Sequence, residues 1–193
     1  MFNRSIIKEL EAWKNKEDRK PLIMLGARQV GKTSVLKRFG KEQFVHCAYF
    51  SLDEEKGVCD IFRTTKNPVQ IIEQLSFLSE VPILPQETLL ILDEIQDCPE
   101  AISAMKYFCE KTPEYAVACA GSLLGLAFGH EGFSFPVGKV DHIKMYPVTF
   151  TEFLEQKDAG LYRYYQSIND IEPLPQIFFD RLSQAFTAYR ISG

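Results

Sequence analysis

The residues best suited to chemistry form one short segment, Gly26-Ala27-Arg28-Gln29-Val30-Gly31-Lys32-Thr33, followed by Ser34. This segment satisfies the pattern GxxxxGK[ST], the phosphate-binding loop called Walker A, without a mismatch. Its glycines let the backbone turn closely enough for successive N–H groups to face phosphate oxygens. Lys32 supplies a positive charge to the β- and γ-phosphates, and the Thr33 hydroxyl is suited to Mg²⁺. The sequence therefore predicts that residues 26–34 bind a nucleoside triphosphate with magnesium.

Two carboxylates, Asp93 and Glu94, follow the apolar run at residues 88–92. A carboxylate at the end of a buried strand is costly unless a cation or another partner lies near it. Asp93 is therefore predicted to hold the water shell of Mg²⁺. Glu94 is predicted to be the base that orients the attacking water.

A third polar position, Ser122, follows the run Ala118-Cys119-Ala120-Gly121 at the end of the next predicted strand. A small hydroxyl there can reach the γ-phosphate or the lytic water, although hydroxyls after glycine are also frequent in simple turns. Glu94, Ser122 and Lys32 form the predicted catalytic group. Thr33 and Asp93 are the predicted metal-binding residues.

Short apolar runs alternate with helical patterns along the first three quarters of the chain. This alternation predicts an α/β fold, a parallel sheet covered by helices on both faces. Residues 1–147 are predicted to form the nucleotide-binding domain. Aromatic-rich helical patterns follow, and residues 148–193 are predicted to be a helical lid or the start of a truncated C-terminal region. Strands are expected at 22–25, 44–52, 88–92, 115–119 and 143–146, and helices up to Trp13 and from Lys32, Pro68 and Pro99.

The composition narrows the class of protein. The chain has 193 residues, is 46% hydrophobic and carries a net charge of −4, so no global field draws it to nucleic acid or anionic membranes. No run of eighteen apolar residues occurs, which predicts no membrane partner and a cytoplasmic location. The five cysteines show no metal-ligand spacing and are expected to be reduced.

The motifs together resemble the AAA+-like predicted ATPases of bacteria and archaea, in which an N-terminal AAA domain precedes an uncharacterised C-terminal domain. The resemblance implies an additional-strand P-loop sheet, with the phosphate-loop strand beside the sensor strand. It also implies a Walker B glutamate at Glu94 and a sensor 1 residue at Ser122. It is carried by a helix ending in Trp13, Arg19-Lys20-Pro21-Leu22, the 26–33 loop, Asp93-Glu94-Ile95-Gln96, Gly121-Ser122 and Tyr146-Pro147-Val148-Thr149-Phe150-Thr151-Glu152-Phe153-Leu154.

Two departures from the family pattern bear on function. Relatives often carry Gly-Arg where this chain has Gly138-Lys139, and lysine lacks the planar fork of arginine. Relatives also continue into a further domain beyond residues 189–193, so a truncated chain is expected here. If the protein forms rings, the candidates for an arginine acting across the subunit interface are Arg163, Arg181 and Arg190.

The predicted function is a slow ATPase that binds ATP with Mg²⁺ and couples hydrolysis to a conformational change. ATP is favoured over GTP because no guanine-reading NKxD motif occurs. The alternative is a nucleotide-dependent regulatory switch with little or no turnover, and a small-molecule phosphotransferase ranks last. Beyond ATP and ADP, a homo-oligomer is left open as a partner, and so is an effector or nucleic acid bound through the missing C-terminal region.

Overall fold

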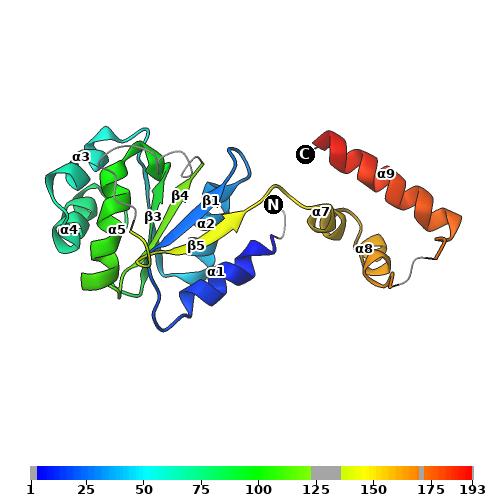
Figure 1. Ribbon diagram of the computed structural model, residues 1–193, viewed down its shortest axis with the longest axis horizontal. Helices are drawn as coiled ribbons and strands as arrows, with labels where there is room; N and C mark the ends of the chain where they lie inside the picture. Colours follow the sequence, from blue (N-terminus) through cyan, green and yellow to red (C-terminus); the bar gives the residue numbers. More distant parts are fainter. Residues whose placement is uncertain (1–3, 123–135, 170–171, 193) are drawn as a thin grey trace. The chain divides into compact units, whose positions relative to one another are not determined.

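The computed structural model describes residues 4–122, 136–169 and 172–192, and Figure 1 shows the course of the chain. The chain divides into two compact units. One is Ile6–Met145. The other combines Met1–Ser5 with Tyr146–Gly193.

The larger unit is built on a five-stranded sheet in the order β2-β3-β4-β1-β5, with every neighbouring pair parallel. The predicted α/β fold with a parallel sheet is confirmed, and so is the pairing of the phosphate-loop strand β1 with β4, the strand that precedes Ser122. Parallel strands all point the same way, so the residues that follow them gather at one edge. The strands are β1 (Leu22–Gly26), β2 (His46–Ser51), β3 (Thr88–Asp93), β4 (Ala116–Gly121) and β5 (Asp141–Met145).

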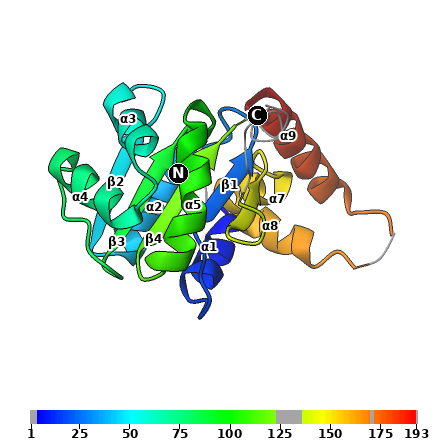
Figure 2. The same ribbon diagram turned by 60° about the vertical axis from the view of Figure 1, so that its left-hand side comes forward.

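Helices cover both faces of this sheet, and two apolar clusters form the core. Successive strand residues enter opposite clusters: Leu90 packs on one face, and Leu89 and Ile91 pack on the other. Burial on both faces explains why β3 reads as an unbroken apolar run. Figure 2 shows α5 and α2 on opposite sides of the strands. One face carries α1 (Ile6–Lys14) and α2 (Lys32–Gln43), and the other carries α3 (Lys56–Thr64), α4 (Pro68–Leu78) and α5 (Pro99–Lys111).

Among the described α-helices of this unit, α3 is the one that the sequence did not predict. Its apolar residues Val58, Cys59, Ile61 and Phe62 are all buried, in the spacing of one helical face. The usual start signals are missing, because Glu55 caps the helix without a side-chain hydrogen bond and Gly57 lies in the first turn. Packing against the sheet therefore outweighs a weak local preference.

The smaller unit consists of helices, as predicted for the end of the chain: α7 (Phe150–Lys157), α8 (Ala159–Gln166) and α9 (Gln176–Ser192). The apolar residues of α9 are buried only in part. Phe178, Leu182 and Tyr189 are half-buried, whereas Phe186 is 48% exposed. The core of this unit is completed by Phe153, Leu154 and Leu161, which are buried.

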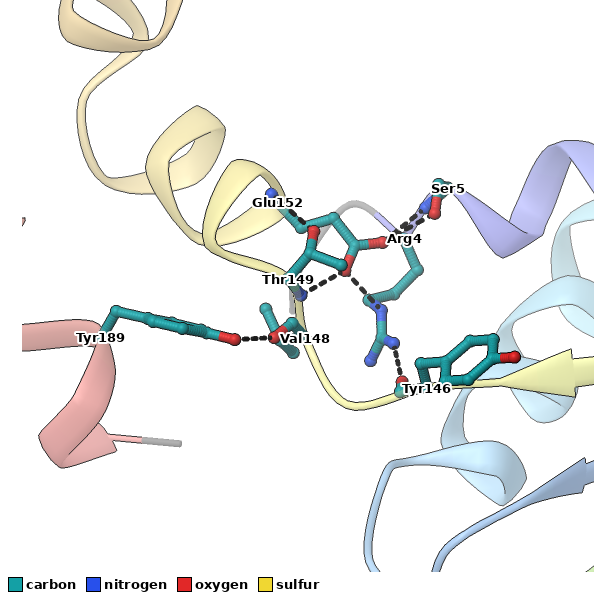
Figure 3. A network of polar contacts seen from close by, with 7 residues as sticks. All are labelled: Arg4, Ser5, Tyr146, Val148, Thr149, Glu152 and Tyr189. Atoms are coloured by element: carbon teal, nitrogen blue, oxygen red, sulfur yellow. Dashed lines mark hydrogen bonds and ion pairs between the residues drawn. The ribbon is translucent and has the colours of Figure 1, made fainter. Parts of the chain in front are cut away.

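A polar network around Glu152 connects the N-terminal residues to α7 (Figure 3). Thr149 and Glu152 form a reciprocal capping box at the start of α7. The Glu152 carboxylate also accepts hydrogen bonds from Ser5 N and Ser5 Oγ, both at 2.9 Å, and lies 3.3 Å from Arg4 Nε. In the same unit, Tyr189 Oη donates to Val148 O at 2.7 Å. These contacts explain why Arg4 and Ser5 belong to the C-terminal unit.

The network predicts a pH-dependent stability. Burial opposes the ionisation of Glu152, but the hydrogen bonds from Thr149 and Ser5 and the charge of Arg4 outweigh burial and lower its pKa. The stabilisation is therefore complete above the unfolded pKa of about 4.3 and is lost as pH falls through the lower folded pKa. At pH 7, Glu152→Gln is expected to lower the free energy of unfolding by about 1–3 kcal/mol. The difference from wild type should shrink towards pH 3, as measured by urea unfolding with circular dichroism.

The matched control for this prediction is Glu155→Gln, one turn along α7, for which no hydrogen bond to a described residue occurs. Its unfolding free energy should follow that of wild type at every pH. A Glu152→Gln deficit that persisted unchanged at pH 3 would contradict the assignment of the effect to the ionised carboxylate.

Candidate functional site

The segment 26–34 leaves the end of β1 and enters the first turn of α2, as a phosphate-binding loop must. A Cβ on Gly26 would lie 2.5 Å from Met145 O on the neighbouring strand β5, so only glycine fits at this position. Gly31 has φ 92° and Gln29 has φ 62°, both in the left-handed region. Ala27, Arg28 and Gln29 are exposed, and Val30 is half-buried. The backbone of this loop is therefore held in a special conformation by the sheet beneath it.

Lys32 is the first residue of α2, and its side chain folds over the loop. The residue is only 6% exposed. Its Nζ donates to Gly26 O at 3.1 Å and to Ala27 O at 2.8 Å. Burial lowers the pKa of Lys32, opposed by the charges of Glu94 and Asp93. No carboxylate in the described residues comes within ion-pair distance of this ammonium group, so a buried cation is left without a paired anion.

The two predicted magnesium ligands are in direct contact. Thr33 Oγ1, in the first turn of α2, donates to Asp93 Oδ2 at 2.6 Å, and Asp93 is the last residue of β3. Asp93 is 5% exposed, and its Oδ1 accepts a hydrogen bond from Glu94 N at 3.0 Å. A hydroxyl and a carboxylate that converge in this way offer oxygen donors of the kind that Mg²⁺ uses. Ser34 follows at an exposed position of the same turn.

Tyr49 is a further member of this group that the sequence did not single out. Its hydroxyl donates to Asp93 Oδ2 at 3.1 Å from the neighbouring strand β2. Burial raises the pKa of Tyr49 to about 12, so the hydroxyl keeps its proton and remains a donor. The ammonium group of Lys37 lies 3.2 Å from the centre of the Tyr49 ring. No sequence motif marks Tyr49, because only the pairing of β2 with β3 brings it beside Asp93.

This contact leads to a prediction on stability. Tyr49→Phe removes one donor from a buried carboxylate and should lower the free energy of unfolding by about 1–3 kcal/mol in the absence of Mg²⁺. Urea unfolding followed by the fluorescence of Trp13, the single tryptophan, measures the change. Tyr107→Phe on α5 is the matched control, since its hydroxyl bonds to no described residue. If the two variants lost the same stability, the bond to Asp93 would contribute nothing.

Glu94 and Ser122 come together at the ends of β3 and β4. Ser122 Oγ lies 3.5 Å from Glu94 Oε2, a long contact. The side chain of Gln96 bridges the two residues: its Nε2 donates to Glu94 Oε2 at 2.6 Å, and its Oε1 accepts from Ser122 N at 3.2 Å. Glu94 has φ 48°, a left-handed conformation that is unfavourable for this residue type. The structure thus places Lys32, Thr33, Asp93, Glu94 and Ser122 at one edge of the sheet.

Two other basic residues that the sequence analysis named, Lys139 and Arg181, form ion pairs with carboxylates outside this group. Lys139 precedes β5, and because β5 runs parallel to β1, this position is at the opposite edge of the sheet from the 26–34 loop. There it pairs with Glu110 at 2.9 Å. In the smaller unit, Arg181 pairs with Asp158. Among the described residues, no group of three His, Cys, Asp or Glu side chains forms a cluster that could bind a metal ion.

Comparisons with known proteins agree with the α/β fold. A family model described as an AAA domain matches residues 18–154. No curated protein sequence matches the chain. A Walker-type ATPase of Pyrococcus abyssi is similar in structure, with 19% identity and a TM-score of 0.52, covering 90% of this chain and 60% of that one.

Two further solved structures are more distant. PCH-2 of C. elegans has 12% identity and a TM-score of 0.45, covering 89% of this chain and 51% of that chain. The Orc1 protein of Aeropyrum pernix, solved in complex with DNA, has 16% identity and a TM-score of 0.46, covering 81% and 49%. The chain therefore spans about half to three fifths of the length of these proteins. The fold is that of P-loop NTPases.

Proposed function

The chain belongs to the AAA domain family, within the AAA+-like ATPases, and we propose that it binds ATP with Mg²⁺ at residues 26–34 and hydrolyses it slowly. Nucleotide binding and hydrolysis in general follow from the family. The observation that carries the finer proposal is the buried ammonium group of Lys32, whose partners among the described residues are carbonyl oxygens and which lies at the start of a helix. A phosphate oxygen is the anion that such a site lacks.

The residues present fit a nucleoside triphosphate with magnesium. In the described part of the chain, the backbone N–H groups of Arg28 and Gln29 donate no hydrogen bond, which leaves them for phosphate oxygens. Thr33 and Asp93 would hold Mg²⁺, and the hydrogen bond between them, which brings a hydroxyl and a carboxylate together, supports this assignment. When bound, Mg²⁺ would supply positive charge that offsets the negative charge of the phosphates. Lys32 would turn from the loop carbonyls to the phosphates.

Glu94 supplies the base in this proposal. Its carboxylate lies beyond the end of β3, next to the group formed by Asp93 and Thr33, where it can orient water towards the γ-phosphate. Ser122 would contact the γ-phosphate from the end of β4. Catalysis of this type consists of positioning and charge stabilisation, so these few residues are sufficient.

The coupling of hydrolysis to a conformational change belongs to the same proposal. The helices α7, α8 and α9 are proposed to act as the lid that responds to nucleotide. A homo-oligomer is the first partner to test, and an effector or a nucleic acid comes next. Among the described residues, no helix is long and apolar enough to cross a membrane. The five cysteines carry free thiols, which favours the cytoplasm as the compartment.

Phosphate release from ATP by the wild-type chain tests the proposal. Release is expected with Mg²⁺ and is expected to stop when EDTA removes it, and GTP should be the poorer substrate. A fluorescent ATP analogue measures binding in parallel. Tight, magnesium-dependent binding without any release would reject the ATPase and favour a nucleotide-dependent switch. Absence of binding would reject both.

A further inference from the structure

Gln96 joins the two residues that are proposed to act on the γ-phosphate, although no motif gave it a role. It lies in the 3-10 turn η1 (Ile95–Asp97), between β3 and α5. Its Nε2 donates to Glu94 Oε2 at 2.6 Å and to Asp97 Oδ2 at 3.1 Å, while its Oε1 accepts from Ser122 N at 3.2 Å. One side-chain amide therefore connects the end of β3 to the end of β4.

The surroundings of Gln96 allow only one orientation of this amide. Two of its neighbours, Glu94 and Asp97, are carboxylates that accept hydrogen bonds, and the third is the backbone N–H of Ser122, which can only donate. In the flipped amide, Oε1 would face two carboxylates and Nε2 would face an N–H group, so all three bonds would be lost. The donors and acceptors around Gln96 therefore fix its amide with Oε1 towards Ser122 and Nε2 towards Glu94.

The bond to Gln96 also decides which oxygen of Glu94 is available. Glu94 Oε2 receives Gln96 Nε2 and, at a longer distance, Ser122 Oγ. Glu94 Oε1 accepts no hydrogen bond from any residue in 4–122, 136–169 or 172–192, so it is left for water. The Glu94 backbone is in the left-handed region, at φ 48°, a conformation that persists only where the surroundings enforce it.

We propose that Gln96 is a positioning residue that couples Ser122 to Glu94. When a γ-phosphate binds the Ser122 side chain, the Ser122 N–H group that donates to Gln96 Oε1 moves. The Gln96 amide follows this N–H group, and because its Nε2 is bonded to Glu94, the carboxylate of Glu94 moves too. Glu94 is then aimed at the water only when the γ-phosphate is present. This inference rests on the proposed ATPase function and deepens it.

Gln96→Met tests the coupling, since methionine has a similar length and makes none of the three bonds. The expected result is a kcat lowered about 10- to 100-fold, because a misplacement of about 1 Å costs about that much. KM for ATP and the dissociation constant of the fluorescent analogue should stay at wild-type values. Gln74→Met, on an exposed position of α4, is the matched control and should keep the wild-type kcat.

A measurement that does not depend on turnover uses the side-chain NH₂ signals of glutamine in nitrogen-15 NMR. The Gln96 signal is assigned through its connection to the Gln96 backbone in triple-resonance spectra of the wild-type protein. In the nucleotide-free protein, one of its protons should be shifted by the charged acceptor and return to the ordinary range in Glu94→Ala. Addition of Mg²⁺ with a non-hydrolysable ATP analogue should shift the signal in wild type. Glu94→Ala keeps Gln96 in place, so this measurement stands even if Gln96→Met does not fold.

The outcomes separate this inference from the proposed function. A wild type that hydrolyses ATP, together with a Gln96→Met variant of unchanged kcat, would overturn the coupling alone. A Gln96 signal that has the same chemical shift in wild type and in Glu94→Ala, and that does not change when the ATP analogue is added, would also overturn the coupling. A wild type that binds no nucleotide would overturn the coupling together with the function on which it rests.

Discussion

Lys32→Ala is expected to abolish detectable nucleotide binding and, with it, phosphate release. The ammonium group is buried and, within the part of the chain that the structure describes, is bonded to carbonyl oxygens and to no anion, so a phosphate would supply the missing negative charge. Two hydrogen bonds between charged groups, each worth about 1.5–3 kcal/mol, correspond to a loss of affinity of roughly 100-fold or more. Titration with the fluorescent ATP analogue in the presence of Mg²⁺ measures this loss.

The fold should survive this substitution. Alanine is the best helix former, and Lys32→Ala removes a buried charge, so the thermal midpoint of the free protein should be equal to or above that of wild type. Lys41→Ala, at an exposed position in the last turn of the same helix, controls for the loss of one positive charge and should bind as wild type does. Undiminished affinity in Lys32→Ala would place the nucleotide elsewhere on the protein.

The parts of the site that the sequence predicts are those in which local chemistry and local structure coincide. Gly26, Gly31, Lys32 and Thr33 form a contiguous motif, and an apolar run before it predicts the strand β1 that presents it. Asp93 follows another such run. Both apolar runs predict buried strands of a parallel sheet, so the carboxyl ends of these strands lie at the same edge. The contact between Thr33 and Asp93 agrees with this expectation.

The contacts that the sequence does not predict are long-range ones made by ordinary polar residues. Tyr49 reaches Asp93 only through the register of β2 and β3, and Gln96 reaches Ser122 only because η1 turns towards the end of β4. Arg4 and Glu152 are 148 positions apart and meet through the packing of the smaller unit. Tyrosines within strands and glutamines after strands occur in many structural roles, so the residue type alone does not predict these contacts.

Whether this site turns over ATP or only senses it depends on Glu94. A switch needs Lys32 and Thr33 to bind nucleotide but has no use for a base. The chain retains the carboxylate, the Glu94 backbone has a strained conformation, and the side chain of Gln96 donates a hydrogen bond to the carboxylate. Strain of this kind persists only where the surroundings enforce it and is typical of functional positions. The arrangement favours hydrolysis over a purely regulatory site.

Glu94→Gln is accordingly expected to bind ATP as wild type does and to lose turnover. The substitution keeps the size of the side chain and removes the base, which contributes typically about 100- to 10,000-fold to such reactions. The measurement is phosphate release under saturating ATP, with the dissociation constant of the fluorescent analogue determined on the same sample. Glu73→Gln, at an exposed position of α4, is the matched control for the lost charge. A Glu94→Gln variant with wild-type kcat would mean that another group orients the water, and the role of Gln96 would fall with that of Glu94.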